Sequence, residues 1–212
     1  MKIFTSALLL YMLVSSITPG PNNLTMLFLG ARYGFKGTLK FMTGSMLTFL
    51  VKGAICGLLN LALADIMPKA VVYLKWVGAA YMVYLGITMA LSGFKAEKEA
   101  KASESGADEP RKTSSTLAPT ESTYRSGILL QLLNMKSWIA AISIFAVYVI
   151  PVDKSLGAIL AATLVDFLFL TASSSVWGLF GSAIRSFVDK YRKPFGIICG
   201  LSLVYCAVTA LL

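Results

Sequence analysis

Residues Thr38–Ala64 read TLKFMTGSMLTFLVKGAICGLLNLALA, a run that is long and apolar enough to cross a lipid bilayer. Near its middle lies a lysine, Lys52. Insertion scales put the cost of a lysine at the centre of a membrane helix at about 2.5–3.5 kcal/mol, so its presence there indicates a functional site. A second apolar run, Leu156–Leu179, holds an acid at similar depth, Asp166.

The composition of the chain is that of an integral membrane protein. Hydrophobic residues make up 57% of it and charged residues 14%, whereas a typical soluble domain has about 25% charged residues. About 20 apolar residues cross the hydrocarbon layer of a bilayer, and six runs of this scale predict six transmembrane helices. These runs are Phe4–Gly30, Thr38–Ala64, Val71–Leu91, Arg125–Ile150, Leu156–Leu179 and Phe195–Leu212. The first lacks a small-residue cleavage site, so we expect it to be retained rather than removed as a signal peptide.

The net charge of +9 comes mainly from basic residues between these runs, where they set orientation and do not indicate nucleic-acid binding. One side of the membrane carries 13 of the 19 Lys and Arg residues and the other side carries 4. By the positive-inside rule the richer side is cytoplasmic. Both termini are therefore expected outside.

The segment 94–124 differs from the rest of the chain. It is charged, rich in Ser, Ala, Glu and Lys, and has no apolar period, which predicts a flexible cytoplasmic linker with a helical stretch around Ala96–Ala102. The linker separates residues 1–93 from residues 125–212, with three predicted spans in each part. A shift of 118 residues also superposes Thr48 on Asp166 and Gly78 on Gly196. With three spans in the first part, the second part enters the membrane from the opposite side. The two parts therefore predict an inverted repeat, a common transporter construction.

Helix-breaking residues interrupt the first run, where Thr18 to Asn23 read TPGPNN. Proline lacks an N–H group and glycine permits unusual dihedral angles. The backbone groups that they free must be buried in protein or line a wet cavity at membrane depth. We expect Asn22 or Asn23 to cap a helix that restarts at Leu24, with its positive end facing an anion. The alternative is a plain proline kink.

The fourth run has a smaller counterpart of this motif, Asn134-Met135-Lys136. Lys136 either binds a ligand or extends to the membrane surface. Asn134 either binds a ligand or hydrogen-bonds between helices as part of the packing.

Each buried charge lies on a polar face of its helix. In the second run, Thr48, Lys52, Cys56 and Asn60 recur at intervals of four, which places them on one face. At a rise of about 1.5 Å per residue, Lys52 and Asp166 both lie about 16–18 Å from the outer surface. Two interpretations stay open: a structural ion pair, or two halves of a binding site.

An α-amino acid fits the second interpretation, because its carboxylate and ammonium complement Lys52 and Asp166. Competition between a proton from outside and the substrate ammonium from inside for Asp166 predicts antiport. The predicted proton carrier is Asp166. The predicted substrate-binding residues are Pro19, Gly20, Pro21, Asn22, Asn23, Thr48, Lys52, Asn134 and Lys136.

Four stretches resemble the LysE/RhtB family of bacterial amino-acid exporters: TPGPNN, GARYGFKG after it, YLKWVGAAYMVYLG in the third run and LLNMKSW in the fourth. The resemblance covers all six runs. It implies an inner-membrane exporter of amino acids or derivatives that is driven by the proton gradient. Family members usually carry Asn-Pro-Lys in the fourth span, and Met135 here replaces that proline, so a milder break is expected. The family's acid in the fifth span corresponds to Asp166.

Other classes fit the sequence less well. The chain has no histidine, no Cys-x-x-Cys and no Gly-x-Ser-x-Gly motif, so we expect no metal site, no cofactor and no enzyme activity. Two alternatives remain: an exporter of another small solute or cation, and a non-transport assembly component. The buried Lys52 favours neutral amino acids as substrates, and the small size of the predicted bundle suggests a homodimer.

Overall fold

The structure is a computed structural model that describes residues 3–60, 67–104 and 122–211. Within those ranges every regular element is a helix, which confirms the predicted all-α class. The elements are α1 (Ser6–Ile17), α2 (Pro21–Leu59), α3 (Met67–Glu104), α4 (Tyr124–Leu133), α5 (Met135–Ser143), the π-helix η1 (Ile144–Val149), α6 (Leu156–Ala183), α7 (Arg185–Lys190) and α8 (Arg192–Leu211).

In the part of the chain that the structure describes, two helices are long and apolar enough to cross a membrane: α2, over Pro21–Leu58, and α6. A third span results if α4 and the segment α5–η1, which meet at a bend of 60°, are taken together. Shorter apolar helical segments lie at Ser6–Ile17, Trp76–Ser92 and Lys193–Thr209. These helices fit a membrane protein, and the six-span inverted repeat stays a prediction.

The expected linker, 94–124, is described only in part. Helix α3 continues to Glu104, so the first residues of that segment are helical. Residues 105–121 lie outside the described residues, as do residues 61–66 at the end of the second predicted span. Helix α4 then begins at Tyr124, where the Thr123 hydroxyl accepts a hydrogen bond of 3.1 Å from the Ser126 N–H.

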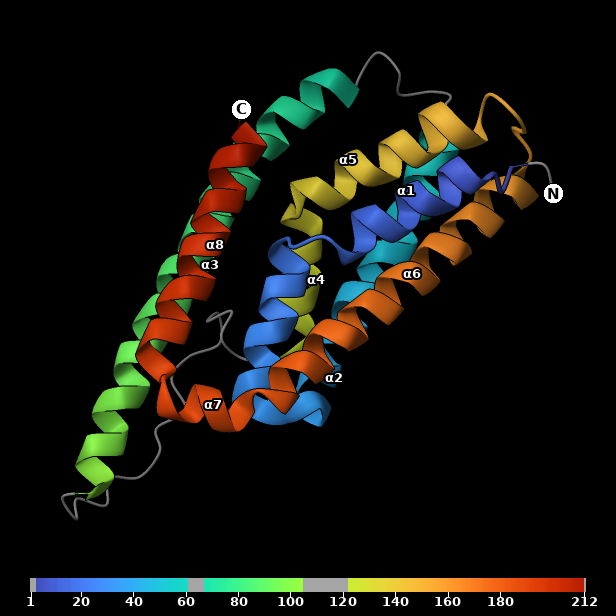
Figure 1. Ribbon diagram of the computed structural model, residues 1–212. Helices are drawn as coiled ribbons and strands as arrows, with labels where there is room; N and C mark the ends of the chain where they lie inside the picture. Colours follow the sequence, from blue (N-terminus) through green and yellow to red (C-terminus); the bar gives the residue numbers. More distant parts are fainter. Residues whose placement is uncertain (1–2, 61–66, 105–121, 212) are drawn as a thin grey trace.

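Helix α2 forms the centre of the bundle. It is kinked at Gly34, whose φ of 72° is a left-handed conformation that side chains disfavour. The chain changes direction at this kink, and the two parts of α2 pack against α6 and α4 (Figure 1).

Helices α3 and α8 form a pair beside this bundle. They run side by side in opposite directions (Figure 1). Small residues let them approach closely, because a Cβ atom at Gly86 would lie 2.6 Å from the Gly200 carbonyl oxygen. Fewer contacts join this pair to the other helices than join α3 to α8.

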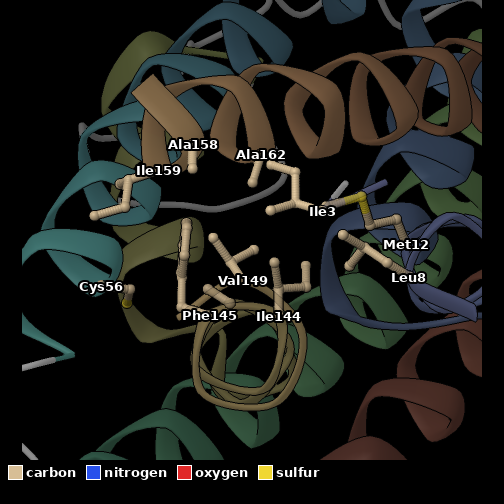
Figure 2. Close-up of a cluster of buried hydrophobic side chains, with 11 residues drawn as sticks. Ile3, Leu8, Met12, Cys56, Ile144, Phe145, Val149, Ala158, Ile159 and Ala162 are labelled. Carbon is tan, nitrogen blue, oxygen red and sulfur yellow. The ribbon is translucent and has the colours of Figure 1, made fainter. Parts of the chain in front are cut away.

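An apolar cluster packs α1, η1 and α6 together at one end of the bundle (Figure 2). Its buried side chains include Leu8, Met12, Phe145 and Ile159. Cys56 of α2 lies in the same cluster and is a free thiol, as are Cys199 and Cys206.

Candidate functional site

The chain is non-helical between α1 and α2, and we call Thr18–Gly20 the first break. Thr18 (φ −62°, ψ 143°) and Gly20 (φ −167°, ψ 176°) are extended. Helix α2 begins at Pro21, whose ring fixes the φ angle that a first helical residue needs. The expectation that Asn22 or Asn23 caps a helix from Leu24 is therefore wrong, since Gly20 is the N-cap and no side chain bonds there.

The two asparagines instead join the first break to α6. Asn23 donates to the backbone carbonyls of Ser16, at 2.7 Å, and Thr18, at 3.0 Å. Asn22 donates to the Ser174 hydroxyl at 2.9 Å and accepts from Ser45 at 2.7 Å. The carbonyl groups that the break frees are thus satisfied by buried side chains.

The second break is Asn134, between α4 and α5. Its backbone is extended (φ −77°, ψ 94°), and the helices meet at a bend of 60° although the next residue is Met135 and not a proline. Lys136, in the first turn of α5, crosses to the first break. Its Nζ donates to the Thr18 carbonyl at 2.8 Å and to the Thr18 hydroxyl at 2.7 Å. The two breaks therefore lie side by side.

Lys52 contacts the second break from α2. The side chain is 2% exposed, and its Nζ donates to the Ser137 hydroxyl, which also accepts from Gln131 Nε2 at 2.8 Å. The ammonium lies 5.4 Å from the ring centre of Phe49 and 5.3 Å from that of Trp138. Gln131 lies in the last turn of α4 and Ser137 in the first turn of α5, so the hydrogen bond between them spans the bend, and Lys52 supports it from α2.

Lys52 and Asp166 are both described and buried, and no salt bridge joins them. The structural ion pair expected as one interpretation is therefore wrong. A predicted common depth does not determine the direction of a long side chain, and the lysine turns toward Ser137 and the two aromatic rings instead.

Asp166 faces a polar cavity of about 40 Å³ that lies between the two breaks. Its side chain is 7% exposed and has no hydrogen-bond partner among the described residues. Three neighbouring amide oxygens also lack a donor: those of Asn23, Gln131 and Asn134. The lining residues that carry polar side chains are Ser15, Ser16, Asn22, Asn23, Gln131, Asn134, Lys136, Ser137 and Asp166.

This set of unpaired acceptors determines what the cavity can bind. Buried oxygen atoms without a donor are costly, and a carboxylate is more so. A ligand with several N–H donors and a positive charge satisfies them. A substrate ammonium, a proton on the carboxylate and ordered water all meet this requirement.

A second cavity, of about 330 Å³, adjoins the first. It shares four lining residues with the polar cavity: Ser15, Gly20, Lys136 and Ala140. Its remaining walls come from α1, the first break, the start of α2, α3, α5 and α8, namely Tyr11, Pro19, Pro21, Met82, Ile139, Cys206 and Thr209.

The predicted site residues thus fall into groups. Asn22, Asn23, Asn134 and Asp166 line the polar cavity, Pro19 and Pro21 the larger one, and Gly20 and Lys136 both. Lys52 lies behind Ser137, and Thr48 bonds the Gly44 carbonyl of its own helix at 2.9 Å.

Gln131 and Ser137 also line the polar cavity, although neither is among the predicted site residues. Gln131, Asn134 and Ser137 follow one another at intervals of three in an otherwise apolar run. That spacing was the signal that could have identified them.

Comparison with known proteins gives the family. The LysE type translocator family matches residues 13–212. Cysteine/O-acetylserine efflux proteins of Shigella flexneri and Escherichia coli K12 are 29% identical to this chain over 206 and 203 residues. The alignments cover 97% and 96% of this chain, and 96% and 95% of the relatives. No solved structure matches significantly. Because the family match covers nearly the whole sequence, the chain belongs to the LysE type translocator family.

Proposed function

We propose that this protein exports neutral amino acids or close derivatives across the bacterial inner membrane by proton antiport. Its membership of a translocator family and its similarity to two amino-acid efflux proteins support the export of amino acids. The apolar helices support a location in the membrane.

The proposed arrangement in the membrane is a 3+3 inverted repeat. In the first part, residues 1–93, α1 and the start of α2 form a broken first span, followed by the rest of α2 and by α3. In the second part, residues 125–212, α4 to η1 form a broken fourth span, followed by α6 and α8. The positions of the breaks support this arrangement, since each interrupts the first span of its half and Lys136 bonds one to the other. In this arrangement the linker 94–124 is cytoplasmic and both termini are outside.

The polar cavity is the proposed site for the charged groups of the substrate. The substrate ammonium replaces water against Asp166 and the amide oxygens of Asn23, Gln131 and Asn134. The substrate carboxylate replaces Thr18 as the group that accepts hydrogen bonds from Lys136, near the free N–H groups at the start of α2. Lys52 is then a positioning residue, which acts on Ser137 and Gln131 and does not touch the substrate.

Coupling to protons follows from the lack of a partner for Asp166. A single buried carboxylate cannot hold a proton and an ammonium ion at the same time. A proton that arrives from outside therefore displaces the substrate, and a substrate that arrives from inside displaces the proton. This competition is what an antiporter requires.

The observation that carries the proposal is the carboxylate of Asp166, buried between two helix breaks without a hydrogen-bond partner among the described residues. Everted membrane vesicles with an acidic lumen test it with cysteine, O-acetylserine, alanine, leucine and lysine. We expect the wild type to accumulate the neutral compounds and not lysine.

The variant Asp166→Asn should lose this accumulation while the protein remains folded in the membrane. The matched control is Asp153→Asn, because Asp153 is an exposed carboxylate before α6, and it should behave like the wild type. Accumulation by Asp166→Asn at the rate of the control would contradict the proposal.

A further inference from the structure

The larger cavity lies between parts of the chain that are distant in sequence. Met82 comes from α3, and Cys206 and Thr209 come from α8. Tyr11 and Ile139 face them from α1 and α5. Figure 1 shows α3 and α8 as a pair beside the other helices, so this cavity lies where the pair adjoins the bundle.

The two cavities differ in size and chemistry. The polar cavity, at about 40 Å³, holds a few water molecules, since one water needs about 10–15 Å³. The larger cavity, at about 330 Å³, is within the range of about 300–1,000 Å³ that small-molecule sites have. Its walls are mainly apolar, with hydroxyl groups and one thiol.

Lys136 stands at the junction of the cavities. It lines both of them, and its ammonium is held by Thr18 at 2.7 and 2.8 Å. Among the described residues that line the larger cavity it is the one charged side chain, and none of them carries a carboxylate. A cationic side chain placed there would therefore meet a like charge and find no counter-ion.

We propose that the larger cavity binds the uncharged side chain of the exported amino acid and that its walls select substrates by size and charge. This inference rests on the proposed function. With the ammonium and carboxylate of the substrate in the polar cavity, a substituent on the α-carbon points past Lys136 into the larger one. The residues that set the size limit are Met82, Ile139 and Cys206.

Cys206 gives a test that does not require transport. A variant with Cys56→Ala and Cys199→Ala keeps Cys206 as its one thiol, and the variant with Cys56→Ala and Cys206→Ala is the matched control. Both are purified at full length and treated with N-ethylmaleimide. Leucine at about ten times its dissociation constant should slow the modification of Cys206 about tenfold. The rate of modification is proportional to the fraction of the protein that has no leucine bound. Lysine should not slow it, and Cys199 in the control should show no protection.

A substitution that makes the cavity smaller tests the same inference during transport. Ile139 is 46% exposed, so Ile139→Trp fills the cavity without a large change in the core. It should lower leucine export about tenfold relative to alanine export, equivalent to about 1.4 kcal/mol. Ile87→Trp, at a 52% exposed position outside the cavity, should leave the ratio of leucine to alanine unchanged.

The outcomes separate this inference from the proposed function. If the wild type exports leucine but leucine does not protect Cys206, the cavity does not hold the side chain and the inference is overturned. Equal loss of leucine and alanine export in Ile139→Trp overturns it as well. If the wild type exports no amino acid and none protects Cys206, both proposals fail.

Discussion

Replacing Gly20 by alanine should release Lys136 from the first break. Gly20 has an extended backbone that any residue adopts, so the effect is purely steric. A Cβ atom there would lie 2.9 Å from Lys136 Cδ and 3.3 Å from its Nζ, which forces the lysine to move. This movement should break or weaken the two hydrogen bonds from the ammonium to Thr18. Each hydrogen bond to a charged group contributes about 1.5–3 kcal/mol. Because Lys136 is only part-buried, hydrogen bonds to water make up for part of the stabilisation that is lost. We expect a net loss of about 2 kcal/mol.

The assay is thermal unfolding of the purified protein together with export in vesicles. For a chain of this size, about 2 kcal/mol lowers Tm by about 4–8 °C. The matched control is Gly157→Ala, because a Cβ at Gly157 would meet only the Ser155 hydroxyl, at 3.9 Å. Export by Gly20→Ala should fall at the same time, because the Cβ pushes Lys136, the proposed carboxylate ligand, out of its place between the two breaks. If Gly20→Ala and Gly157→Ala have the same Tm and the same export rate, Lys136 does not hold the two breaks together.

Two further substitutions test other parts of the structure. Lys52→Met removes a buried ammonium whose burial costs about 2.5–3.5 kcal/mol and whose hydrogen bond to Ser137 returns about 1.5–3 kcal/mol. Unfolding experiments should therefore show a stability change below about 2 kcal/mol, whereas export should be lost; a folded, active variant would show that Lys52 is dispensable. Gly86→Leu should separate α3 from α8, because a Cβ at this position already lies 2.6 Å from the Gly200 carbonyl oxygen. It should lower Tm well below that of the exposed control Gly157→Leu, and an unchanged Tm would exclude the close packing.

The helical class could be predicted from the sequence because it depends on local signals. Apolar runs of the right length predict helices, and the cluster from Pro19 to Pro21 marks the residues where α1 gives way to α2. The rise per residue predicts a common depth for Lys52 and Asp166, which stays a prediction. Polar spacing along α6 also indicated the face that carries Asp166 and Ser173, both of which are buried.

The contacts between side chains could not be predicted in this way. Depth does not determine the direction in which a long side chain turns, so the bond from Lys52 to Ser137 was missed. The bond from Lys136 to Thr18 joins residues 118 positions apart, and no local pattern indicates it. The larger cavity is lined by residues of five helices that are distant in sequence, and its existence depends on how the pair α3 and α8 adjoins the bundle.

The exchange of protons for amino acids can be measured without an imposed pH gradient. Proteoliposomes are loaded with a neutral amino acid and a trapped pH indicator, and then diluted into medium without the amino acid. Because coupling is reciprocal, the amino acid that leaves should drive protons inward and acidify the lumen. We expect this acidification in the wild type and in Asp153→Asn, and its absence in Asp166→Asn. Efflux of the amino acid from wild-type vesicles with no change in internal pH would contradict proton antiport through Asp166.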